Sequence, residues 1–71
     1  MSKKVDVIAG FEHTGWSTAF CPILRSAKTG RLIMRLTGSL ANNAETAAQS
    51  ARLVAEYNAY HVDDIITDHE I

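Results

Sequence analysis

An alanine-rich segment at residues 42–58 constrains the fold of this chain more than any other part of the sequence. At 100° per residue, its alanines and Val54 gather on one broad side of a helix, with Asn58 near the end. Small side chains let a helix approach a sheet closely but bury little area each, so the larger apolar residues of the sheet must supply most of the hydrophobic stabilisation. The alanines of this predicted core side are Ala44, Ala47, Ala48, Ala51, Ala55 and Ala59.

The start of the helix is marked by Asn42, the predicted N-cap, and by Glu45 three residues later, a spacing that resembles a capping box. Gly38 and Ser39 supply the break before it. We therefore predict a helix over residues 42–58 whose alanine side packs against a sheet.

Alternating apolar and polar residues predict three strands before the helix and one after it. Gly30 can take the positive φ that closes the hairpin between the second and third strands. Pro22 lacks a backbone donor, so the second strand is predicted to lie at a sheet edge or to carry a bulge. The predicted strands are residues 5–9, 16–25, 31–37 and 62–67, with a turn at 12–15 and with Leu32, Met34 and Leu36 on one face.

With 71 residues, the chain is near the lower size at which a hydrophobic core holds a fold by itself. The content of 46% hydrophobic and 21% charged residues is that of a globular protein. We therefore predict a single α+β domain over residues 1–71. It consists of a three-stranded antiparallel meander, the alanine-rich amphipathic helix and a fourth strand, in the order βββαβ.

Charge and apolar runs exclude several classes of protein. Seven basic and eight acidic residues give a net charge of -1. The chain therefore lacks the positive electrostatic potential of most nucleic-acid-binding proteins. No apolar run approaches the roughly 20 residues that span a bilayer, and residues 1–4 lead into a strand rather than into a signal-peptide core. We expect a cytoplasmic protein with no membrane contact and no nucleic-acid partner, in which the single Cys21 is buried and inert.

The charges are also unevenly distributed along the chain, which leaves a two-sided electrostatic surface open. The first half carries most of the basic residues, and the second half carries most of the acidic ones. The basic residues of the first half are Lys3, Lys4, Arg25, Lys28, Arg31 and Arg35, and the acids of the second half include Asp63, Asp64, Asp68 and Glu70.

The stretches Ile23-Leu24-Arg25, Asn42-Asn43-Ala44-Glu45 and Ile65-Ile66-Thr67-Asp68 carry a resemblance to a known family. Within the order strand, strand, strand, helix, strand, they resemble the first half of a ribonuclease H-like domain. In that family an Asn-Asn-x-x-Glu pattern starts the helix, Thr-Asp-Ser follows on the next strand, and the carboxylates bind magnesium for phosphodiester hydrolysis. The resemblance implies a reduced ribonuclease H-like core in which Glu45 and Asp68 are catalytic and metal-binding residues.

The carboxylate set that this resemblance implies is incomplete. The family's first strand carries Asp-Gly-Ser where this chain has Ile8-Ala9-Gly10, between Asp6 and Glu12. The Asn-Asn to Glu spacing is one residue short, and a capping box alone accounts for it. Two-metal hydrolysis needs several carboxylates that converge on ions about 4 Å apart. A metal-dependent nuclease or nucleic-acid binder is therefore the alternative hypothesis.

The side of the helix opposite the alanines carries Leu53 and Tyr57 one turn apart, with Ser50 beside them and Tyr60 close by. Two interpretations stay open: isolated apolar residues on a surface, which need no explanation, or a protein interface. On the second interpretation, the partner-binding residues are Leu53, Tyr57, Tyr60 and Ser50.

The leading hypothesis is a small non-catalytic interaction or regulatory protein that binds another protein through the outer helix face or a sheet edge. Domains of this size occur among phage and mobile-element regulators, including inhibitors of host proteins, which is an association and not a derivation. A homodimer is expected as a corollary, since a second copy enlarges a thin core. On this hypothesis the chain is not an enzyme and has no catalytic residue, metal or cofactor.

Overall fold

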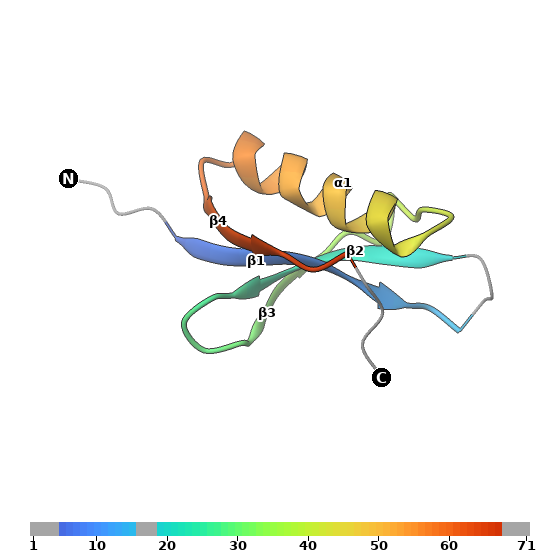
Figure 1. Cartoon of the computed structure of the whole chain (residues 1–71), viewed down its shortest axis with the longest axis horizontal. Helices are drawn as coiled ribbons and strands as arrows, with labels where there is room; N and C mark the ends of the chain where they lie inside the picture. Colours follow the sequence, from blue (N-terminus) through green and yellow to red (C-terminus); the bar gives the residue numbers. More distant parts are fainter. Residues whose placement is uncertain (1–4, 16–18, 68–71) are drawn as a thin grey trace.

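The computed structural model describes residues 5–15 and 19–67, which form one four-stranded sheet with a helix on one face (Figure 1). The elements are β1 (Asp6–His13), β2 (Phe20–Ser26), β3 (Leu32–Arg35), α1 (Ala44–Tyr57) and β4 (His61–Ile65). The strand order is β3-β2-β1-β4. The first three strands form an antiparallel meander, and α1 carries the chain back so that β4 runs parallel to β1. The predicted α+β fold with the order βββαβ is confirmed.

The alanine side of α1 packs on the sheet, as predicted. Ala47, Ala48, Ala51 and Ala55 have no exposed surface. Because these residues contribute little more than methyl groups, most of the buried apolar area comes from the sheet. The cluster around Ala51 and Ala55 contains Val7, Ala9 and Leu24, with Met34, Leu36, Tyr60, Val62 and Ile65 packed against it. No helix in the described part of the chain is long and apolar enough to cross a membrane.

The helix begins one residue later than predicted. Asn43, not Asn42, is the N-cap: its backbone is extended (φ -148°, ψ 165°), and its Oδ1 accepts a hydrogen bond from the Thr46 N–H at 2.7 Å. The predicted pairing of Asn42 with Glu45 as a capping box is therefore wrong. Glu45 instead lies in the first turn, where its negative charge interacts favourably with the helix dipole.

The helix ends in a Schellman motif built on a non-glycine residue. The Tyr60 N–H donates to the Ala55 carbonyl at 2.9 Å, and the Ala59 N–H donates to the Glu56 carbonyl at 3.0 Å. Ala59 has a φ of 64°, the left-handed conformation that usually requires glycine, and it is exposed. The prediction that Ala59 belongs to the core side is wrong because the helix has already ended.

β1 is longer than predicted, because it continues through Gly10 to His13. Glu12 pairs with Cys21 and His13 pairs with Phe20, so the predicted turn at these two residues is wrong. Trp16, within the predicted second strand, lies outside the described residues. Gly30 has a φ of 79° in the loop between β2 and β3, as predicted.

Pro22 lies in β2, which is an interior strand, so of the two predicted alternatives the edge position is wrong. The other alternative, a bulge, agrees with a register shift in β2 between Leu24 and Arg25. The Pro22 carbonyl accepts a hydrogen bond from the Leu36 N–H at 2.9 Å, just beyond the end of β3. The Leu36 carbonyl accepts instead from the Ser39 N–H at 3.0 Å. The Ser39 N–H thus supplies the hydrogen bond that proline cannot donate to the Leu36 carbonyl. This turn lets proline occupy an interior strand.

A register shift between β2 and β3 changes which residues of β3 face the helix. Met34 pairs with the buried Leu24, whereas Leu32 pairs with Arg25, the next residue along β2. Paired residues lie on the same face of a sheet and successive residues lie on opposite faces. Leu32 therefore lies on the face away from α1, and the prediction that it shares a face with Met34 and Leu36 is wrong.

Candidate functional site

The outer side of α1 carries two exposed apolar side chains. Leu53 is 56% exposed and Tyr57 is 92% exposed, and they lie four residues apart on the helix. The buried alanines occupy the opposite side of the same helix. We call Leu53 and Tyr57, with the half-buried Ser50 one turn before them, the outer ridge. The structure brings these three predicted residues together on one side of α1.

A short polar network flanks the outer ridge. Arg52 donates through Nε to the Oε1 of Gln49 and through Nη1 to the Oε2 of Glu56, each at 2.9 Å. All three residues belong to α1, so this network holds the Arg52 guanidinium along the helix. The ridge is therefore an apolar strip beside a fixed ion pair.

Tyr60 lies apart from the ridge. It lies two residues after the C-cap Asn58, is half-buried, and packs against the core cluster that contains Ala55. A hydrophobic contact at this position commonly accompanies a Schellman motif. Tyr60 thus packs at the end of α1, whereas the side chain of Tyr57 is exposed to solvent.

The structure describes only one of the two carboxylates of the alternative hypothesis. Glu45 is exposed in the first turn of α1, and Asp68 lies outside the described residues. The carboxylates on either side of Ile8-Ala9-Gly10 are engaged with other groups: Asp6 Oδ1 lies 3.1 Å from His61 Nδ1, and Glu12 binds Arg35. Within residues 5–15 and 19–67, no group of three or more His, Cys, Asp or Glu side chains is arranged to hold a metal ion.

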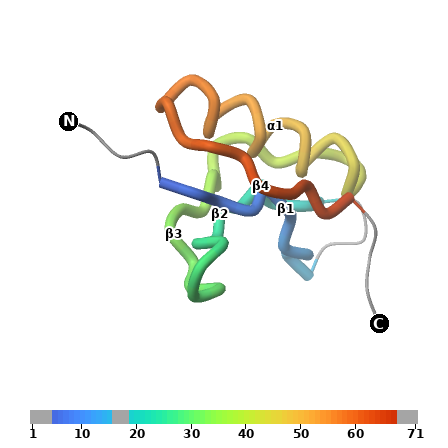
Figure 2. The backbone as a smooth tube through the Cα atoms, turned by 60° about the vertical axis from the view of Figure 1, so that its left-hand side comes forward, coloured from blue at the N-terminus to red at the C-terminus, as the bar shows by residue number. Residues whose placement is uncertain are grey.

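The face of the sheet away from α1 forms a second candidate surface, which we call the open sheet face. In Figure 2 the helix lies along one side of the strands, and no second described helix packs on the other side. Strand pairing places Asp64, Ile8, Arg25 and Leu32 in one row across this face. The adjoining row contains Gly10, Ile23 and Arg35, and Ile66 lies beside Gly10.

An ion pair crosses the open sheet face from β1 to β3. The Nε of Arg35 lies 2.7 Å from Glu12 Oε1, and the Nη2 of Arg35 lies 3.1 Å from Glu12 Oε2. The residues between them on β2 are Cys21, the ladder partner of Glu12, and Ile23, the ladder partner of Arg35; each is only 3% exposed. The ion pair thus shields β2 on the face over which no described helix packs.

The same ion pair shifts the pKa values of its own two groups and of the neighbouring Cys21 thiol. Hydrogen bonds from Arg35 lower the pKa of Glu12, and the hydrogen bond to Glu12 raises the pKa of Arg35. Burial raises the pKa of the Cys21 thiol, and the nearby Glu12 carboxylate raises it further. Cys21 is therefore a buried thiol that resists ionisation, in agreement with the predicted burial.

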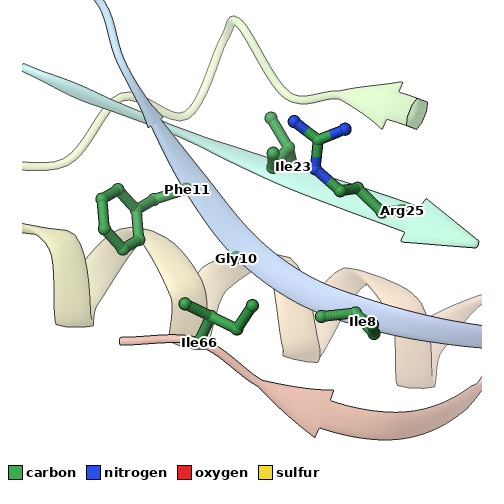
Figure 3. Close-up of a pocket in the computed structure, with 6 residues that line it drawn as sticks. All are labelled: Ile8, Gly10, Phe11, Ile23, Arg25 and Ile66. Carbon is green, nitrogen blue, oxygen red and sulfur yellow. The ribbon is translucent and has the colours of Figure 1, made fainter. Parts of the chain in front are cut away.

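A hollow lies in the middle of the open sheet face (Figure 3). Gly10 leaves its centre without a side chain, and Figure 3 shows Ile8 and Ile66 beside it with α1 behind the strands. Arg25 borders the hollow on the β2 side. The complete lining is Ile8, Gly10, Phe11, Ile23, Arg25 and Ile66.

The open sheet face could not be predicted from the sequence. Its residues come from four strands, and the pattern within each strand does not reveal which residues become neighbours across the sheet. One local signal was present: Ile8, Gly10 and Glu12 keep the two-residue spacing of a strand beyond residue 9. That spacing predicts a longer β1, but not the pairing of Glu12 with Arg35.

Over residues 5–15 and 19–67, the fold and these surfaces define a small two-layer α+β domain with one exposed strip on its helix and one sheet face that no helix covers. Comparison of the chain with protein-family models, with curated proteins and with solved structures found no match.

Proposed function

We propose that this chain is a small non-catalytic interaction protein that binds another protein through the outer ridge of α1. The observation that carries the proposal is the exposure of Tyr57, at 92%, one turn from Leu53. Tyrosine supplies a large and fairly rigid contact area with a polar end, and it is enriched among residues that dominate binding energy. The buried alanines hold α1 against the sheet, so the ridge is presented by a supported helix.

The proposal extends to a regulatory role in the cytoplasm, such as the inhibition of a host protein by a phage or mobile-element product. The support for this role is the net charge of -1, which suits a protein-binding chain better than a nucleic-acid binder. Self-association belongs to the same proposal, because a second copy enlarges a core to which the helix contributes mainly alanines.

The test uses the purified chain as bait in the native host, followed by mass spectrometry. The double variant Leu53→Glu/Tyr57→Glu is expected to retain about a tenth or less of the partner captured by the wild type, since a few residues dominate most interfaces. The matched control is Leu40→Glu, an equally apolar and 53% exposed residue that lies outside α1. Equal capture by the double variant and the control would remove the ridge from the proposal.

The alternative is a metal-dependent nuclease or nucleic-acid binder on a reduced ribonuclease H-like core. Its support is the βββαβ order, on which the resemblance depends. It expects magnesium- or manganese-dependent cleavage of an RNA/DNA hybrid that disappears in Glu45→Gln and in Asp68→Asn. The absence of cleavage at high protein and metal concentrations would end this alternative. We rank it second because Asp6 and Glu12 are paired with His61 and Arg35.

A further inference from the structure

The open sheet face combines an apolar centre with charges of opposite sign at its two sides. Ile8, Gly10 and Ile66 surround the central hollow. Leu32, on the β3 side, is 38% exposed, and Ile66, on the β4 side, is 40% exposed. Large apolar side chains exposed on a helix-free sheet are typical of a surface that another protein layer covers.

The charges of this face are segregated by strand. Arg25 on β2 and Arg35 on β3 lie on one side, and Asp64 on β4 lies on the other. Arg35 is neutralised by Glu12, whereas neither Arg25 nor Asp64 forms an ion pair with another described residue. Arg25 donates to the Gly30 carbonyl at 3.2 Å, and Asp64 accepts from the Ile65 N–H at 2.8 Å. One basic and one acidic side chain therefore remain available on opposite sides of the hollow.

We propose that the open sheet face binds a second copy of this chain, face to face, about a two-fold axis that runs along the strands. This axis places β4 of one copy over β3 of the other, since the strand order is β3-β2-β1-β4. The Asp64 side of each copy then meets the Arg25 side of its partner, twice in the dimer. A two-fold axis across the strands would instead place β4 over β4 and bring like charges together.

The size of the face sets the strength of the dimer. The four strands have 8, 7, 4 and 5 residues, so at about 3.3 Å per residue and about 4.8 Å between strands they cover about 380 Å² on each copy, or about 760 Å² in total. That area is below the usual range for stable interfaces, so we expect a weak, transient dimer that dissociates at micromolar concentrations or above. The outer ridge lies on the other side of the domain, so the dimer presents two ridges that face away from each other. Such a dimer presents one ridge to each of two separate partner molecules.

Sedimentation equilibrium from about 5 µM to about 500 µM brackets micromolar affinity and tests the dimer. The wild type is expected to shift from monomer to dimer over this range. Arg25→Asp and Asp64→Arg are each expected to weaken association about tenfold or more, because each replaces the attraction between Asp64 of one copy and Arg25 of the other, one strand apart across the interface, with repulsion. The combined variant Arg25→Asp/Asp64→Arg restores opposite charges and is expected to recover most of the wild-type affinity.

Glu45→Arg on α1 changes the net charge in the same direction and by the same amount as Asp64→Arg, so it is the control matched to that variant and is expected to dimerise like the wild type. Circular dichroism and thermal unfolding establish that each variant is folded. A wild-type chain that stays monomeric across the whole range overturns the proposal. So does a dimer that is lost in Leu53→Glu/Tyr57→Glu while the charge reversals leave it intact, because that dimer uses the outer ridge. A combined variant as weak as the single ones also overturns it.

Discussion

Glu12 on β1 and Arg35 on β3 are joined by two hydrogen bonds, of 2.7 and 3.1 Å, that cross over the intervening strand β2. The pair links residues 23 positions apart in the sequence and covers Cys21 and Ile23. It substitutes for a second helical layer over this part of the sheet.

The first prediction concerns the stability of the fold at acid pH. The pKa of Glu12 is lowered from an ordinary value of 4.5, chiefly because Arg35 donates hydrogen bonds to the ionised carboxylate. A carboxylate whose pKa is lowered by folding stabilises the protein above its unfolded pKa, and this contribution is lost as the pH falls through the folded pKa. The free energy of unfolding is therefore expected to fall as the pH drops below 4.5.

Urea unfolding at about pH 7 and about pH 3 measures this loss. Glu12→Gln is expected to show a smaller fall than the wild type, because its side chain no longer ionises. Arg35→Gln is expected to show a smaller fall too, because it removes the largest cause of the shift. Wild-type pH dependence in both variants would show that the ion pair does not contribute to acid unfolding.

The second prediction concerns the reactivity of Cys21. The thiol is 3% exposed, and burial raises its pKa, so both access and ionisation oppose reaction with an aromatic disulfide reagent. We expect slow labelling of the native chain, fast labelling in urea, and faster native labelling in Glu12→Ala. Glu45→Ala removes a carboxylate from α1 and serves as the control, with the wild-type rate expected. If Glu12→Ala labels as slowly as this control, Cys21 is shielded by other groups.

The third prediction separates the two neighbouring asparagines at the start of α1. Asn43→Ala removes the side chain that accepts the hydrogen bond from the Thr46 N–H, and it is expected to lower the free energy of unfolding by about 1 kcal/mol. Asn42→Ala changes an exposed residue before the cap and is expected to have an effect within about 0.5 kcal/mol. Chemical denaturation of the two variants compares them directly. The reverse order of stabilities would restore Asn42 as the cap.

The fourth prediction concerns the left-handed residue at the end of α1. Ala59 has a φ of 64°, so Ala59→Gly is expected to raise the free energy of unfolding by about 1 kcal/mol by relieving backbone strain. Ala59→Val is expected to lower it, because a β-branched side chain tolerates this conformation less well. Thermal and chemical unfolding provide the measurement. A glycine variant less stable than the wild type would contradict the proposed strain.

The sequence by itself determined the elements and the two sides of the helix. The spacing of Ala47, Ala48, Ala51 and Ala55 identified the buried side, and the same periodicity placed Leu53 and Tyr57 opposite them. These features depend on the geometry of one helix, so residues close together in the sequence are sufficient to predict them. Gly30 is a similar case, because its turn is closed by neighbouring residues.

Only the tertiary structure decided which strands are neighbours and in what register. Pro22 occupies an interior strand because the Ser39 N–H donates to the Leu36 carbonyl, which proline cannot do. Leu32 lies on the other face of the sheet because of one register shift between β2 and β3. The pairing of Glu12 with Arg35 depends on β1 and β3 lying on opposite sides of β2. A strand pattern specifies which residues share a face, whereas the partners across the sheet depend on contacts between distant segments. The outer ridge could therefore be predicted from the sequence, and the open sheet face could not.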